Sequence, residues 1–176
     1  DSLMLPFPRT SAAALSRLRI ARVPRGLYRS GHSGLESSLS RGGVVWVPAG
    51  RLDYPDIVAQ LADLFLRVDG VEWVIAAGRY RDGLYFSLRT LDPGAHAGDL
   101  VRQVVGSRGS AGGHGEMAGA RIDVGRLAPD EYEELLESLF EEFCEQLGVS
   151  DQARDPLIGI DSAAEPKSAP DSGSTR

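Results

Sequence analysis

The residues best suited to bind a charged ligand lie in a glycine-rich segment around a histidine. Gly112 and Gly113 precede His114, and Gly115 follows it. Glycines let backbone N–H groups approach an anion closely and adopt dihedral angles that turn several such groups inward. The imidazole adds a donor and a flat face on which a base can stack. The composition fits an anion-binding loop, and on spacing alone it fits a flexible turn as well.

A predicted β-hairpin brings a hydroxyl, an aromatic ring and a guanidinium onto one surface. Residues 71–81 and 84–90 have the composition of strands, and Asp82-Gly83 between them favours a two-residue hairpin turn. Because side chains alternate along a strand, one face of the second strand should carry Tyr85, Ser87 and Arg89. That face suits a phosphate site, and it equally suits the polar outer face of an ordinary half-buried strand.

The charge distribution permits an anionic ligand. The formal net charge of −6 argues against one at first. Eight acids and no bases lie in residues 130–145, however, and the other 17 acids are outnumbered by 19 bases, 18 of them arginine. Arginine forms bidentate contacts with phosphate, although a bias of the source genome explains the same preference. Arg89 and Arg108 are the cations expected to supply positive charge near the glycine-rich segment.

Several catalytic motifs are missing. The sequence contains no GxxxxGK[ST] phosphate loop and no GxSxG nucleophile elbow. His32, His96 and His114 are far apart and lack the spacing of metal ligands. The single cysteine, Cys144, lies beside an apolar helical stripe and is expected to be a packing residue. No apolar run approaches the roughly 20 residues of a membrane helix, so we expect no membrane partner and a cytoplasmic location.

The predicted fold is α/β, a single domain with a mixed sheet of about five strands covered by helices. We expect a linker helix over residues 11–22, an irregular stretch over 24–41, and a disordered tail after residue 150. Between them the pattern predicts the following elements: a strand over 43–48, a helix from Asp53 as N-cap to Gly70, the hairpin, a helix over 97–105, the glycine-rich segment 107–120, a strand around 121–124, and a helix over 129–148.

The order of these motifs resembles a known family. Ser87-Leu88-Arg89, then a short helix, then the run from Ser110 to Gly119 (SAGGHGEMAG) is similar to the accessory domain of DHH phosphoesterases. That domain carries an SLR strand and a GGGH loop followed by small residues and a glycine. The resemblance covers roughly residues 43–147. Ser110 and Ala111 stand where the family usually has further glycines, and Met117 where it usually has alanine, so the shape of the loop is expected to differ.

The resemblance implies a substrate-binding domain, residues 42–149, that holds the phosphate and base of a short nucleic acid or nucleotide. Arg89 would grip a phosphate, and Gly112, Gly113 and His114 would contact the terminal nucleotide. Ser87, Ser110 and Ala111 complete the implied site. The ligand could be RNA, DNA, a nucleoside bisphosphate or a cyclic dinucleotide, as in the RecJ-like exonucleases, oligonucleotide nucleases and phosphatases of the family.

The resemblance also implies a partner. Family members place this domain opposite a catalytic domain with two manganese ions, whose Asp-His-His triplet does not occur in these 176 residues. Residues 1–41 would be a linker or the end of such a domain. We therefore expect no cofactor and no catalytic residue in this chain, manganese in the missing catalytic domain, and a parent protein that is a manganese-dependent phosphoesterase.

Two other functions fit the sequence. His114 with acids such as Glu116 would make a self-sufficient metal-dependent hydrolase. Alternatively, the apolar and acidic faces would dock another protein, with a second copy of the chain as one possible partner.

Overall fold

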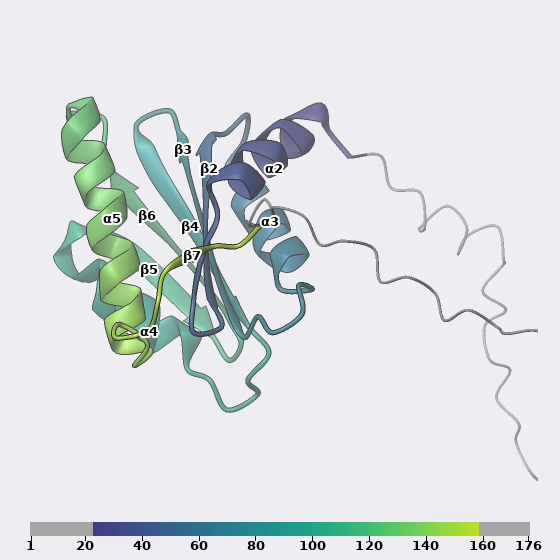
Figure 1. Ribbon diagram of the computed structural model, residues 1–176. Helices are drawn as coiled ribbons and strands as arrows, with labels where there is room; N and C mark the ends of the chain where they lie inside the picture. The colour runs from purple at the N-terminus through teal and green to yellow at the C-terminus, as the bar shows by residue number, and fades with distance from the viewer. Residues whose placement is uncertain (1–22, 159–176) are drawn as a thin grey trace, which may run out of the picture.

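The apolar runs of the sequence build a mixed seven-stranded sheet with helices on both faces (Figure 1). The computed structural model describes residues 23–158, so the helix predicted over 11–22 lies outside the described residues. The strands are β1 (Leu39–Arg41), β2 (Val44–Arg51), β3 (Trp73–Tyr80), β4 (Gly83–Thr90), β5 (Gly109–His114), β6 (Met117–Asp123) and β7 (Asp155–Pro156). The helices are α2 (Arg25–Ser37), α3 (Ile57–Phe65), α4 (Ala97–Val105) and α5 (Pro129–Gln146). The predicted α/β class is confirmed, with seven strands in place of about five.

The strand order is β5-β6-β4-β3-β2-β1-β7. β2 and β3 run parallel and are joined through α3, as a parallel pair requires a crossover connection. All the other neighbouring strands are antiparallel. The last three strands at one edge, β4, β6 and β5, therefore form an antiparallel unit, and β6 and β5 extend beyond α3.

Two apolar cores lie on the two faces of the sheet. One contains Leu84, Phe86 and Leu88 of β4 together with the buried faces of α4 and α5. The other packs α3 against β2 and β3, and Tyr85 of β4 is half-buried against it. The predicted alternation of side chains along β4 is thus confirmed. Cys144 is fully buried in the first core, where burial raises the pKa of its thiol, as fits a packing residue.

The prediction of an irregular stretch over residues 24–41 was wrong. Helix α2 and strand β1 occupy it. The buried face of α2 is made of Gly26, Ser30 and Gly34, spaced at intervals of four. A Cβ atom on Gly34 would lie 2.8 Å from Cγ1 of Val47 in β2, so the small residues serve close helix packing and not flexibility.

Two predicted boundaries also differ from those in the structure. α3 begins at Ile57 after a turn, and Asp53 pairs with Arg29 of α2 at 3.4 Å instead of capping the helix. In the hairpin Tyr80 pairs with Gly83, so the turn is formed by residues 81–82, one position earlier than predicted. A Cβ atom at Gly83 would lie 2.8 Å from both the Arg121 Nε and the Tyr85 ring, so this glycine is needed for packing across the strands.

The glycine-rich segment is a β-hairpin and not a loop. Its two strands, β5 and β6, pair from Gly109↔Ile122 to His114↔Met117, which leaves Gly115 and Glu116 as the turn. β6 therefore begins at Met117, earlier than the strand predicted around 121–124. At the other edge of the sheet, β7 pairs with β1 inside the segment expected to be a disordered tail. The rest of that tail, from residue 159, lies outside the described residues.

Candidate functional site

A cleft of about 650 Å³ lies between α3 and the outer strands β4, β6 and β5. It exists because α3 lies over β3 and β4 and does not reach β6 and β5 at the edge of the sheet. The floor comes from the three antiparallel strands and the wall from the start of α3. All seven site residues predicted from the sequence line this cleft: Ser87, Arg89, Ser110, Ala111, Gly112, Gly113 and His114.

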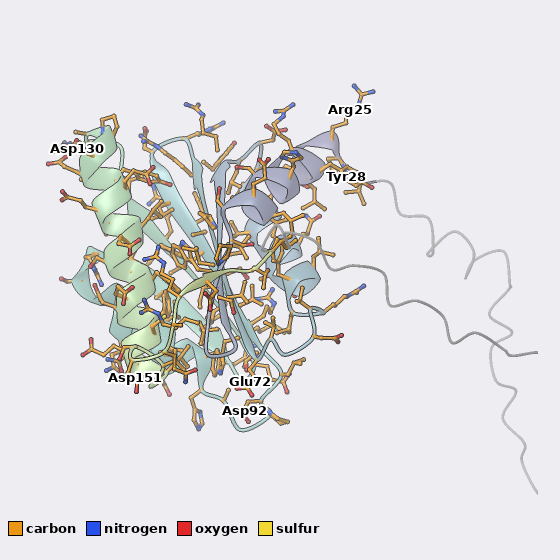
Figure 2. The ribbon with its side chains drawn as sticks, viewed as in Figure 1. Arg25, Tyr28, Glu72, Asp92, Asp130 and Asp151 are labelled. Carbon is orange, nitrogen blue, oxygen red and sulfur yellow. The ribbon has the colours of Figure 1, made fainter. Side chains whose placement is uncertain are left out.

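The strand registers arrange the floor as three rows of side chains on one face. The end row lies near where β3 begins and β4 ends, close to the labelled Glu72 and Asp92 in Figure 2. From that end, the rows are Arg89–Met117–His114, Ser87–Gly119–Gly112 and Tyr85–Arg121–Ser110. The glycines make the middle row the lowest part of the floor. A Cβ atom on Gly112 would have no neighbour within 4 Å, so packing does not require glycine there.

Arg89 is held firmly in the end row. Its Nε donates to Asp63 Oδ1 of α3 at 2.7 Å, and its Nη1 donates to the Ser87 hydroxyl at 2.8 Å and to the Leu88 carbonyl at 3.0 Å. The side chain is 17% exposed. Among the described residues its Nη2 has no hydrogen-bond partner. The guanidinium therefore keeps two N–H donors for a ligand.

His114 shares a row with Arg89 but does not contact it. The exposed imidazole lies at the end of β5, and Met117 of β6 stands between the two residues. Two strand spacings separate them by about 10 Å. The Arg89 and His114 side chains thus border the same cleft from its inner and outer sides.

The backbone of residues 109–114 does not form an anion-binding loop. In an extended strand, successive N–H groups point to opposite edges, so they do not converge on one anion. Gly113 faces α4, and a Cβ atom there would lie 2.4 Å from the Ala118 Cα. Its glycine is required by packing, whereas Gly112 faces the open cleft.

Arg108 does not belong to the cleft, contrary to its expected role. It bonds to both carboxylate oxygens of Glu142 on α5, with Nη1 at 2.8 Å and Nη2 at 2.5 Å. This pair lies with α5 on the opposite face of the sheet. Its hydrogen bonds lower the pKa of the Glu142 carboxyl.

Several cleft residues were missed by reading the sequence. Arg121 and Met117 of β6 face the cleft between β4 and β5, and Asp63 of α3 anchors Arg89. On the wall, Pro55, Asp56, Val58 and Ala59 line the cleft. The pairing of β6 with β4 would have pointed to Arg121, but the strand order of the sheet is not visible in the sequence.

The described residues do not provide a metal centre. No group of three or more His, Cys, Asp or Glu side chains within residues 23–158 is placed to hold an ion. In the same part of the chain, none of the helices is long and apolar enough to cross a membrane.

Comparison with known proteins gives the family. The DHHA1 domain family matches residues 52–146, which is 95 of the 176 residues and more than half of the chain. The chain therefore belongs to the DHHA1 domain family, and the resemblance seen in the sequence is confirmed. The matched range includes the α3 wall and all three strands of the cleft floor. No curated protein matches the chain.

Three solved structures are similar to the chain at low sequence identity. An exopolyphosphatase-related protein from Bacteroides fragilis superposes with a TM-score of 0.50 at 13% identity, over 72% of this chain and 37% of that one. The C-Ala domain of alanyl-tRNA synthetase from Aquifex aeolicus gives a TM-score of 0.43 at 21% identity, over 58% of this chain and 97% of that one. A pGpG-specific phosphodiesterase from Vibrio cholerae gives 0.41 at 11%, over 76% and 44%. The chain thus spans less than half of the two larger proteins.

Proposed function

We propose that the cleft binds the phosphate and base of a short nucleic acid or nucleotide, as the substrate-binding domain of a DHH-family phosphoesterase. The observation that carries this proposal is the position of Arg89. Arg89 is fixed by three hydrogen bonds, and two of its N–H donors have no acceptor among the described residues. Beside a floor of glycines, they can bind a phosphate oxygen.

The other residues suit the rest of a nucleotide. Gly112 and Gly119 leave room for a flat or bulky group above the sheet. The exposed His114 offers a ring for stacking and a donor for a phosphate oxygen or ribose hydroxyl. Ser87 acts on this reading through Arg89, because its buried hydroxyl already accepts a bond from that guanidinium.

In the parent protein, we propose that this domain positions a phosphodiester or phosphomonoester beside a separate DHH catalytic domain. Manganese ions bound there would supply the activated water for hydrolysis. This chain would contribute affinity and orientation. Alone, it is expected to bind weakly and to hydrolyse nothing.

The test is a titration of the 176-residue chain with a 5′-phosphorylated dinucleotide, measured by calorimetry at low and at moderate salt. Arg89→Ala should weaken binding roughly 10- to 100-fold, because a hydrogen bond to a charged group contributes about 1.5–3 kcal/mol. Higher salt should weaken the wild type more than this variant. Gly112→Val should also weaken binding, because the new side chain fills the floor of the cleft from a Cβ position that has no neighbour within 4 Å.

A suitable control is Arg102→Ala, since Arg102 pairs with Asp99 on α4, is 52% exposed and is not part of the cleft lining. Thermal unfolding of each variant checks that the fold is kept. If the affinity for the dinucleotide changes neither with salt nor on Arg89→Ala, a protein-docking role is favoured. Turnover on adding Mn²⁺ that His114→Ala abolishes would favour a self-sufficient hydrolase.

A further inference from the structure

We propose that the far row of the cleft, Tyr85, Arg121 and Ser110, binds the base of a second nucleotide, so that the ligand is a dinucleotide or longer chain. This inference rests on the proposed function, which assigns the first nucleotide to the Arg89 end. It adds a second contact region within the same cleft.

Arg121 presents a flat, half-exposed cation in this row. Its Cζ lies 5.9 Å from the centre of the Tyr85 ring, and its side chain is 45% exposed. The nearest acid, Asp123, is 3.8 Å away and 70% exposed. Such exposed pairs contribute little energy, so Asp123 does not compete strongly for the guanidinium. A guanidinium plane next to an aromatic ring is a surface on which nucleobases stack.

The Tyr85 ring that supports Arg121 is packed in place before any ligand arrives. The Tyr85 ring packs edge-on against Tyr80, with centroids 6.3 Å apart and an interplanar angle of 63°. Gly83 allows the Arg121 Nε and the Tyr85 ring to approach the β4 backbone, at a place where a Cβ atom would lie 2.8 Å from each. A stacking surface that is already ordered loses little entropy when it binds.

The spacing of the rows suits more than one nucleotide. Arg89 and Tyr85 are four residues apart on β4, which is about 13 Å along an extended strand. The glycine row lies between them. The wall covers the same length, because Asp63 of α3 bonds to Arg89 while Pro55 and Asp56 line the cleft before the helix begins. A nucleotide held at Arg89 occupies the near end and the glycine floor, and a second one is needed to use the Arg121 end.

The experiment compares three ligands on the full 176-residue chain by calorimetry. They are AMP, a 5′-phosphorylated deoxyadenosine dinucleotide, and the same dinucleotide with an abasic second residue. We expect the dinucleotide to bind roughly 10- to 100-fold more tightly than AMP, because one base stacked on a protein surface contributes that much affinity. The abasic ligand should lose most of this preference.

Two variants of Arg121 separate stacking from charge. Arg121→Ala and Arg121→Lys should both abolish the preference for the dinucleotide and leave AMP binding unchanged, since lysine keeps the charge but has no planar face. Arg102→Ala is the matched control and should keep the preference. Two results would overturn the assignment to a base. One is that Arg121→Lys keeps the preference for the dinucleotide. The other is that Arg121→Ala loses as much affinity for the abasic ligand as for the intact dinucleotide.

Failure of this inference differs from failure of the proposed function. If the wild type binds AMP and the dinucleotide equally, and Arg89→Ala weakens both, the second region is refuted while the phosphate site remains. If the wild type binds none of the three ligands, the proposed function itself is refuted.

Discussion

Arg89 illustrates how a single side chain depends on neighbours that the sequence does not reveal. Its Nε is fixed by Asp63, which lies 26 positions away on α3, and its Nη1 by Ser87 two positions away on β4. Neither partner accepts a hydrogen bond from Nη2. Asp63 therefore orients the guanidinium, although its negative charge would by itself repel a phosphate.

This dual role of Asp63 leads to a prediction at the residue scale. Asp63→Ala should weaken binding of the 5′-phosphorylated dinucleotide several-fold, because the unanchored guanidinium loses its fixed orientation. Asp63→Asn should retain most of the affinity, since its Oδ1 can still accept the Nε hydrogen. Calorimetric titration of the two variants provides the measurement. If both variants bind more tightly than the wild type, repulsion dominates and Asp63 is not a positioning residue.

At the scale of elements, the cleft floor depends on the close contact between α4 and β5. β5 is an edge strand, and α4 packs directly on it. A Cβ atom at Gly98 of α4 would lie 2.3 Å from the Gly113 carbonyl oxygen. The absence of a side chain at Gly98 thus lets the helix hold the edge strand that carries His114.

Gly98→Ala should therefore lower the free energy of unfolding by about 1–3 kcal/mol, since the methyl group overpacks a backbone contact. The matched control is Gly31→Ala in α2, where a Cβ atom would meet only the Leu61 side chain at 3.6 Å. That change should stabilise the protein by up to about 1 kcal/mol through helix propensity. Urea unfolding curves of both variants measure the difference. If the two variants have the same free energy of unfolding, α4 can move away from β5 without loss of stability.

At the scale of the whole molecule, α5 is tied to the rest of the domain by arginines from distant segments. Arg41 of β1 bonds to Glu141 at 2.5 Å, Arg108 bonds to Glu142, and Arg154 bonds to Glu137. Figure 2 shows Asp130 at one end of α5 and Asp151 beyond the other, with these acids along the helix between them. The acid run of α5 is thus partly an attachment face.

These contacts predict how stability depends on pH. Hydrogen bonds from Arg154 and Arg108 lower the pKa of Glu137 and of Glu142 below the ordinary 4.5. The folded state binds these protons less readily than the unfolded state. The stabilisation is therefore complete above pH 4.5 and is lost as the pH falls through the lower folded pKa.

Urea unfolding between pH 7 and pH 3 should show this loss, and Glu142→Gln should make the decline shallower. Glu145→Gln on the same helix is the control, because Glu145 makes no ion pair among the described residues. A decline of the same steepness in Glu142→Gln and in the wild type would contradict the role of the Arg108 pair.

The sequence by itself determined the features that depend on local periodicity and local chemistry. Three structural features could be predicted in this way: the alternation in β4, the bounds of α4 and the apolar stripe of α5. The SLR and glycine-histidine motifs could be recognised for the same reason, because each involves residues close together along the chain. The same reasoning failed for α2 and β5, where glycines that suggest flexible loops serve close packing between elements.

Only the tertiary structure decided which residues meet in the cleft. The position of β6 between β4 and β5 places Arg121 opposite Tyr85, and the crossover through α3 brings Asp63 onto Arg89. The tertiary structure also places Arg108 on the other face of the sheet, where it pairs with Glu142. These contacts join residues tens of positions apart, and they depend on strand order and on which face each helix covers. Side-chain periodicity fixes which way a residue points from its own element, but it carries no information about which element lies opposite.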